Sequence, residues 1–173
     1  MNAPLTIRRA TSADAGAIAE IHVAAWRAAY RELIPQSYIE SLSVERRREF
    51  WQGALSNPGL SHVALAEHAG VIIGFCSYGP TRDDDDEPGT AEIYSIYVRP
   101  DEWRQGAGQA LCAMAFRDAA ERACPTMTVW VLKDNRLARG FYERVGFSGD
   151  GAERSDASRG IPLQEMRYRK AIA

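Results

Sequence analysis

Twice in this chain, a run of strand-forming residues leads through a short polar or glycine segment directly into a helix. A strand over residues 90–98 precedes an alanine-rich helix over 105–123, with a glycine-bearing turn between them. A second strand over residues 126–132 precedes a helix that begins at Asn135. Strands rich in β-branched and aromatic residues that alternate with helices are typical of a mixed α/β domain.

Two further helices and five further strands are expected. Apolar residues at helical spacing predict helices over 12–32, a region that Pro35 ends, and over 43–55. The remaining strands are expected over 5–9, 62–67, 71–78, 147–153 and 163–170. With 173 residues and no long linker or repeat, we expect one domain over 1–173, with its core over about 5–170.

The turn after the first strand has the features of a phosphate site. Gly106 and Gly108 remove side chains where a ligand must approach the backbone, and the helix behind them begins with unpaired N–H groups. A dinucleotide fingerprint is excluded, because it needs a third glycine where Leu111 stands, and a P-loop is excluded because Gly-Lys-Ser/Thr is absent. Substituting Gly108 with Val is expected to weaken anion binding much more than stability.

The second unit places polar groups on one face of its helix. Asn135 stands at the position of a helix cap, where its side chain can accept from the N–H groups of the first turn. At 3.6 residues per turn, Ala138 and Tyr142 follow Asn135 along the same stripe, and Gly146 ends the helix. Taken alone, Tyr142 is better explained as a core residue.

Together the two units resemble the GNAT superfamily of acyl-CoA-dependent N-acyltransferases. The resemblance is carried by residues 98–111 and by Asn135, Ala138, Tyr142 and Gly146-Phe147. It implies a mostly antiparallel mixed sheet of about seven strands with about four helices, and acetyl-CoA as co-substrate. One departure is Trp103, which stands where the family usually has Gln or Arg, so Arg104 is expected to supply the positive charge. The residues that the resemblance assigns to CoA are Ile96, Tyr97, Val98, Arg104, Gln105, Gly106, Ala107, Gly108, Gln109, Ala110, Asn135, Ala138 and Tyr142.

Composition excludes several other classes of function. The net charge of −2 lacks the basic excess of a nucleic-acid binder, and no apolar run reaches the ~20 residues of a membrane span. The three cysteines form no C-x-x-C pair and the three histidines do not cluster, so we expect neither a metal site nor a disulfide framework. A cytoplasmic protein is expected, and its oligomeric state, a homodimer included, stays open.

Transfer of an acyl group to an amine requires a base and an acid. An amine with a pKa near 10.4 is neutral in only about one molecule in 2,500 at pH 7, and a carboxylate near the acceptor can take its proton directly or through water. Glu92, at the start of the strand expected to carry the pantetheine, is the candidate base; a solvated strand-entry residue is the alternative. Tyr142 is the candidate acid for the leaving thiolate.

The acceptor cannot be identified from the sequence. Trp26 and Tyr30 share a helix stripe and are assigned by the resemblance to the acceptor pocket, although packing between helices would also explain them. The acidic run 83–87 is either a solvated loop or a device that attracts a cationic amine such as a polyamine. We therefore expect an N-acetyltransferase acting on a small primary amine. The alternatives are a protein N-terminus or another acyl-CoA as substrate, or a non-catalytic CoA-binding module.

Overall fold

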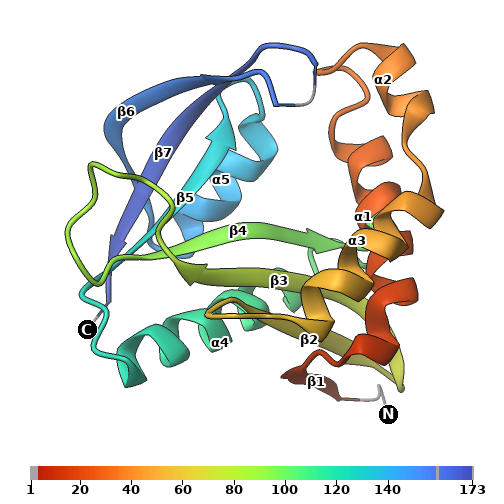
Figure 1. The fold of residues 1–173 in the computed structure, drawn as a ribbon, viewed down its shortest axis with the longest axis horizontal. Coiled ribbons are helices and arrows are strands. Elements are labelled where there is room, and N and C mark those ends of the chain that lie inside the picture. Colours follow the sequence, from red (N-terminus) through yellow and green to blue (C-terminus); the bar gives the residue numbers. More distant parts are fainter. Residues whose placement is uncertain (1–3, 159, 173) are drawn as a thin grey trace.

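The computed structural model describes residues 4–158 and 160–172, and its centre is a sheet of seven strands in the order β1-β2-β3-β4-β5-β7-β6 (Figure 1). Neighbouring strands are antiparallel except for the parallel pair β4 and β5. The expected mixed, mostly antiparallel sheet is therefore confirmed. In chain order the strands are β1 (Leu5–Arg9), β2 (His62–His68), β3 (Val71–Pro80), β4 (Ala91–Val98), β5 (Thr126–Leu132), β6 (Ser148–Asp156) and β7 (Leu163–Ala171).

Helices cover both faces of the sheet. The period-2 alternation of the strands divides the core: Leu65 and Phe75 pack with α1 and α3, whereas Ala66 and Cys76 pack with α4. Tyr142 of α5 belongs to the same core cluster as α4. No helix among the described residues is both long and apolar enough to cross a membrane. The α-helices are α1 (Ala15–Ala29), α2 (Gln36–Ser41), α3 (Val44–Ser56), α4 (Ala107–Glu121) and α5 (Arg136–Arg144).

The first helical region differs from its prediction. A short 3₁₀ turn over Ser12–Asp14 precedes α1, which ends at Ala29, and α2 follows with Pro35 as its N-cap. The described residues thus hold five α-helices instead of about four. A six-residue helix is too short to show an apolar period in the sequence, so the pattern cannot reveal α2.

The strands β4 and β5 separate after a short parallel contact. They pair only from Ala91 with Met127 to Ile93 with Val129, although β4 continues along β3 to Val98 and β5 continues along β7 to Leu132. A bulge at Tyr94, between the pairs Ser77–Ser95 and Tyr78–Ile93, marks the point of divergence. Beyond it, no strand among the described residues pairs with the edge of β4 that faces β5, and a space opens inside the sheet, which we call the splay.

The acidic run 83–87 lies in the loop between β3 and β4 and folds over β7. The guanidinium of Arg167 contacts Asp83 at 3.3 Å and Asp86 at 3.5 Å, and Arg169 also pairs with Asp86. The Asp86 side chain is fully buried and that of Arg167 is only 7% exposed. These ion pairs offset much of the charge on which attraction of a cationic acceptor would depend.

Breaking this ion-pair cluster is expected to destabilise the fold. Arg167→Gln should lower the free energy of unfolding by about 2 to 4 kcal/mol, because the buried Asp86 carboxylate would lose one of its cationic partners. The exposed Asp84 of the same loop supplies the control, and Asp84→Asn should change stability by less than about 0.5 kcal/mol. Urea denaturation measures both, and equal stability of the two variants would contradict a structural role for the cluster.

Candidate active site

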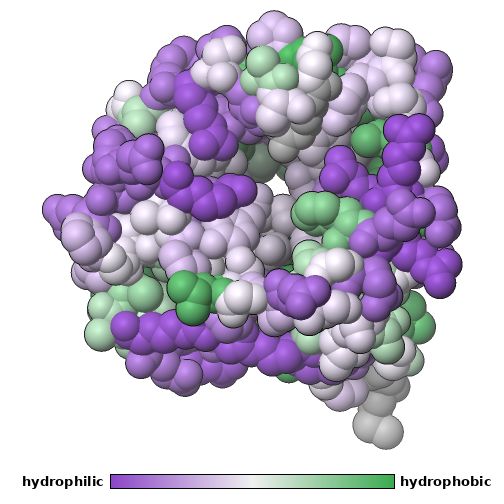
Figure 2. All heavy atoms as spheres, in the orientation of Figure 1, coloured by the Kyte–Doolittle hydropathy of each residue, from purple (hydrophilic) through white to green (hydrophobic). Residues whose placement is uncertain are grey.

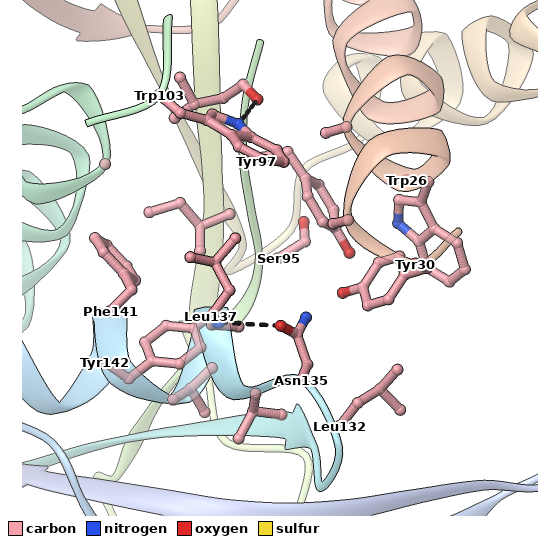
Figure 3. Close-up of a pocket in the computed structure, with 18 of the residues that line it drawn as sticks. Trp26, Tyr30, Ser95, Tyr97, Trp103, Leu132, Asn135, Leu137, Phe141 and Tyr142 are labelled. Atoms are coloured by element: carbon pink, nitrogen blue, oxygen red, sulfur yellow. Dashed lines mark hydrogen bonds between the residues drawn. The ribbon is translucent and has the colours of Figure 1, made fainter. Parts of the chain in front are cut away.

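A cavity of about 740 Å³ fills the splay and extends to the N-terminal ends of α4 and α5 (Figure 3). In Figure 3, Trp26 of α1 and Tyr30, which directly follows α1, stand on one side of it, and Phe141 and Tyr142 of α5 on the other. The structure therefore brings together most of the residues expected in the site. Those that line the cavity are Trp26, Tyr30, Ile96, Tyr97, Val98, Arg104, Gly106, Ala107, Gly108, Gln109, Asn135, Ala138 and Tyr142. Three others, Gln105, Ala110 and Glu92, are not among its lining residues.

The glycine turn ends in an open helix N-terminus. Arg104 and Gly106 both adopt left-handed backbone conformations, with φ of 63° and 89°. Gly106 is the N-cap of α4, and no side chain of the described residues caps this helix, so the first N–H groups of α4 lack an acceptor from a capping residue. A Cβ added at Gly106 would meet nothing within 4 Å. This end of the cavity can therefore hold an anion against backbone N–H groups.

The missing side chain of Gly108 matters for the packing of two helices as well as for the approach of a ligand. A Cβ at this position would lie 3.1 Å from the ring of Phe141, so the missing side chain lets α4 approach α5. A bulky residue here would displace Phe141 in addition to any effect on a ligand. The packing therefore gives no support to the expectation that Gly108→Val spares stability, and Gly106 offers the cleaner test.

Trp103, which departs from the family pattern, holds the glycine turn against the sheet through a hydrogen bond. Its indole Nε1 donates a hydrogen bond of 2.7 Å to the carbonyl oxygen of Val98, the last residue of β4 (Figure 3). The ring thereby positions the segment that leads to Arg104 and Gly106. Arg104 lines the cavity, as expected of a residue that supplies positive charge there.

Asn135 caps α5, and this prediction is confirmed. Its side-chain Oδ1 accepts from the N–H of Ala138 at 3.0 Å, and the residue is buried. Because the oxygen is engaged in the cap, the amide nitrogen is the group left to face a ligand, and Figure 3 shows it directed into the cavity. The cap thus fixes a hydrogen-bond donor at the centre of the site.

Tyr142 lies about two helical turns beyond this cap, on the same face of α5, and lines the cavity. The residue is 7% exposed, and burial raises the pKa of its phenol well above its usual range. The nearby thiols of Cys112 and Cys76 act in the same direction. A phenol with a raised pKa remains protonated at neutral pH, which is the state that a proton donor requires.

Glu92 is enclosed by Arg82. Only 1% of Glu92 is exposed, and its carboxylate accepts from the backbone N–H of Arg82 at 2.9 Å and from the Nε of the same residue at 3.1 Å. The Arg82 Nη2 forms a further ion pair with it. The structure therefore does not bring Glu92 to the cavity surface with Tyr142.

Glu165 is a carboxylate that lines the cavity and that the sequence does not predict as a site residue. It lies on β7 opposite Leu132 of β5, and its Oε2 accepts from the Nε of Arg154 at 2.8 Å. Nothing in the sequence marks it, because its place depends on the pairing of β7 with β5. Ser95 and Trp130 also line the cavity and were not predicted.

Comparisons with known proteins agree with this architecture. Residues 23–147 match the model of the Acetyltransferase (GNAT) family. The chain is 35% identical over 132 residues to the uncharacterized N-acetyltransferase YuaI of Bacillus subtilis (strain 168), which covers 76% of this chain and 73% of that protein. It is 29% identical over 104 residues to the L-methionine sulfoximine/L-methionine sulfone acetyltransferase of Pseudomonas paraeruginosa (strain DSM 24068 / PA7), or 60% of each protein.

The fold is shared with solved structures. PaiA N-acetyltransferase from Thermoplasma acidophilum, solved in complex with coenzyme A, superposes with a TM-score of 0.80 at 19% identity over 97% of this chain and 99% of that one. The family match includes both the glycine turn and the segment from Asn135 to Phe147. The chain therefore belongs to the GNAT family and is an acyl-CoA-dependent N-acetyltransferase.

Proposed function

We propose that this enzyme moves the acetyl group of acetyl-CoA to a primary amine of a small molecule, by direct transfer while both substrates are bound. The observation that carries the proposal is the continuous cavity through the splay. It begins at an open helix N-terminus suited to a pyrophosphate and ends among Trp26, Tyr30 and Tyr97. The unpaired edge of β4 between these ends offers backbone groups to an extended pantetheine arm, as the family resemblance implies.

Residues of this chain account for the proton transfers. The thioester supplies an activated acetyl carbonyl, whose carbon forms a bond to the amine nitrogen as its bond to sulfur breaks. The amine loses a proton to a carboxylate of the site, and the Tyr142 phenol gives its proton to the departing sulfur. The amide nitrogen of Asn135 and the backbone N–H groups of β4 are placed to bind polar groups of acetyl-CoA.

Two carboxylates line the cavity, Glu102 and Glu165. Glu102 lies in the turn that leads to the proposed pyrophosphate site, so Glu165 is the better-placed base. Glu165 faces the cavity directly, whereas Glu92 would act only through water or after Arg82 moves. Glu165→Gln is therefore expected to lower kcat by about 10²- to 10⁴-fold at neutral pH and to recover partly at higher pH, where the amine loses its proton unaided.

Glu92→Gln is the matched comparison, because it makes the same change on β4, two strands away from β7 in the sheet. A pH–rate profile that changes in Glu165→Gln but not in Glu92→Gln assigns the base to Glu165. The opposite result returns the role to Glu92, and two unchanged profiles exclude both carboxylates.

The positions of the cysteines agree with direct transfer of the acetyl group, without an acetylated cysteine as intermediate. Cys76 and Cys112 are buried, burial raises the pKa of both thiols, and no described residue lining the cavity is a cysteine. A small-molecule acceptor is supported by the relative from Pseudomonas, whose name gives L-methionine sulfoximine and L-methionine sulfone as substrates. A protein N-terminus or another acyl-CoA are the alternative substrates.

The test is release of free CoA thiol from acetyl-CoA with a panel of polyamines, amino acids, aminoglycosides and peptides. We expect thiol release that depends on a small amine, with one N-acetylated product formed per thiol. Turnover of peptides alone would replace the small-molecule acceptor with a protein N-terminus. Thiol release without an acetylated amine would reduce the reaction to hydrolysis.

A further inference from the structure

A second cavity, of about 900 Å³, adjoins the first at the splay. It is bordered by α1, α3, the start of β2 and the loop after β3, and it shares Trp26, Tyr94, Ser95 and Tyr97 with the first cavity. In Figure 2 a hollow is visible near the middle of the face, in the region that Figure 1 places between the loop after β3 and the helices α1 and α3. A ligand in this second cavity can therefore reach the splay, where the acetyl group is proposed to be transferred, from the side opposite the glycine turn.

The ionised side chains around this second cavity are all cationic. Arg9, Arg47 and Arg82 line it, and none of its described lining residues is an aspartate or glutamate. An ammonium ion alone would gain no counter-charge from such a lining. The acidic run 83–87, which was expected to favour a cation, contributes no residue to it.

The two histidines of the lining add no charge. The Nδ1 of His22 accepts a hydrogen bond of 3.2 Å from the indole N–H of Trp51, which requires the neutral ring. Burial, reinforced by Arg122 and Arg9, lowers the pKa of His62 below its usual range, so this ring is neutral at pH 7 as well. The charge of the cavity therefore comes from its arginines.

Arg82 is held in a fixed orientation and keeps N–H donors that can bind a ligand. Its Nε and Nη2 bind the buried carboxylate of Glu92, and its guanidinium carbon lies 4.3 Å from the ring centroid of Tyr94. A guanidinium has five N–H donors, so several remain for a ligand, and the side chain is 58% exposed. Glu92 thus acts on this arginine as an orienting partner.

Arg47 supplies charge that no described carboxylate offsets. It is half-buried on α3, and no described residue forms an ion pair with its guanidinium. Arg9 differs, because it is engaged with the buried Asp118. Guanidinium groups bind carboxylates through paired hydrogen bonds, which suits Arg82 and Arg47 for such a group.

We propose that the acceptor is an amine that also carries a carboxylate, as an α-amino acid does, and that Arg82 and Arg47 bind this carboxylate. The inference rests on the proposed transfer to a small-molecule amine and names the class of that amine. The aromatic walls formed by Trp26, Trp51 and Tyr97 favour an apolar group on the same molecule. The amine then points toward Ser95 at the splay, where the two cavities meet.

Matched pairs of amines test this inference. L-phenylalanine is compared with 2-phenylethylamine and L-leucine with 3-methylbutylamine, since each pair differs only in the carboxylate; spermidine serves as the polycation. The rate of thiol release at saturating acetyl-CoA gives kcat/KM for each amine. The amine concentration is counted as that of its neutral form, so that differences in amine pKa do not affect the comparison. In at least one pair, the carboxylate-bearing amine is expected to have a kcat/KM about 10- to 100-fold higher.

Variants then locate the contact. Arg82→Gln and Arg47→Gln should each reduce the preference for the carboxylate-bearing amine about tenfold, and taking the ratio of the two kcat/KM values cancels any general loss of activity. Arg48→Gln is the control, because Arg48 lies on the same helix, is 60% exposed and does not line the cavity. That variant should keep the wild-type preference.

Three outcomes would overturn the inference. Equal kcat/KM within both pairs, or faster turnover of spermidine, would remove the carboxylate from recognition while leaving the proposed function intact. A preference that survives in both Arg82→Gln and Arg47→Gln would place the carboxylate elsewhere. Absence of amine-dependent thiol release with every amine would instead reject the proposed function, and this inference with it.

Discussion

Replacing Tyr142 with Phe is expected to lower kcat by about 10²- to 10⁴-fold while changing the affinity for acetyl-CoA little. The variant keeps the ring in its buried place and removes only the hydroxyl, whose raised pKa keeps it protonated. Without this proton donor, the sulfur must leave as a thiolate, whose conjugate thiol has a pKa of about 8.5. Steady-state kinetics gives kcat, and calorimetry gives the affinity.

Tyr168→Phe is the matched control for this variant. Tyr168 is also a buried tyrosine of the same core, but its hydroxyl bonds to Arg139 and Glu143 and it does not line the cavity. Loss of that hydroxyl should affect stability and leave kcat within a few-fold of wild type. Full activity of Tyr142→Phe, or equal losses in the two variants, would return Tyr142 to a packing role.

The second large effect is expected at Gly106. Gly106→Asp places a carboxylate at the open N-terminus of α4, where the pyrophosphate of acetyl-CoA is proposed to bind. Two unit charges about 4 to 6 Å apart at an effective dielectric of about 20 repel by roughly 3 to 4 kcal/mol. The dissociation constant of acetyl-CoA should therefore rise by about 10²- to 10³-fold, as calorimetry would measure.

Gly106→Asn separates charge from shape. Asn and Asp have nearly the same size, and both tolerate the left-handed conformation that Gly106 adopts, with φ of 89°. The Cβ of either residue enters open space, so the two variants should have similar melting temperatures. If both variants weaken acetyl-CoA binding equally, bulk and not charge is responsible. If neither weakens it, the pyrophosphate does not lie against this turn.

The sequence predicts correctly those features that depend on residues close together in the chain. The cap at Asn135 depends on an N–H three residues later, and the structure has that bond. The strands and the glycine turn also lie close to their predicted positions. Both follow from residues that are neighbours in the chain.

The sequence does not reveal contacts between residues that lie far apart in the chain. Glu92 has the appearance of a free strand-entry carboxylate until Arg82, ten residues earlier, folds back onto it. The acidic run has the appearance of a solvated loop until Arg167, more than eighty residues later, pairs with it across β7. Glu165 reaches the cavity only because β7 adds to the sheet beside β5. No periodicity or motif encodes these long-range contacts.

The claim that one cavity holds both substrates at once is tested most directly by initial rates measured with acetyl-CoA and the preferred amine varied together. Direct transfer predicts double-reciprocal lines that intersect, and no acetylated enzyme when acetyl-CoA is added without the amine. Parallel lines, together with an acetyl group found on the protein by mass spectrometry, would show a covalent intermediate and contradict direct transfer through the splay.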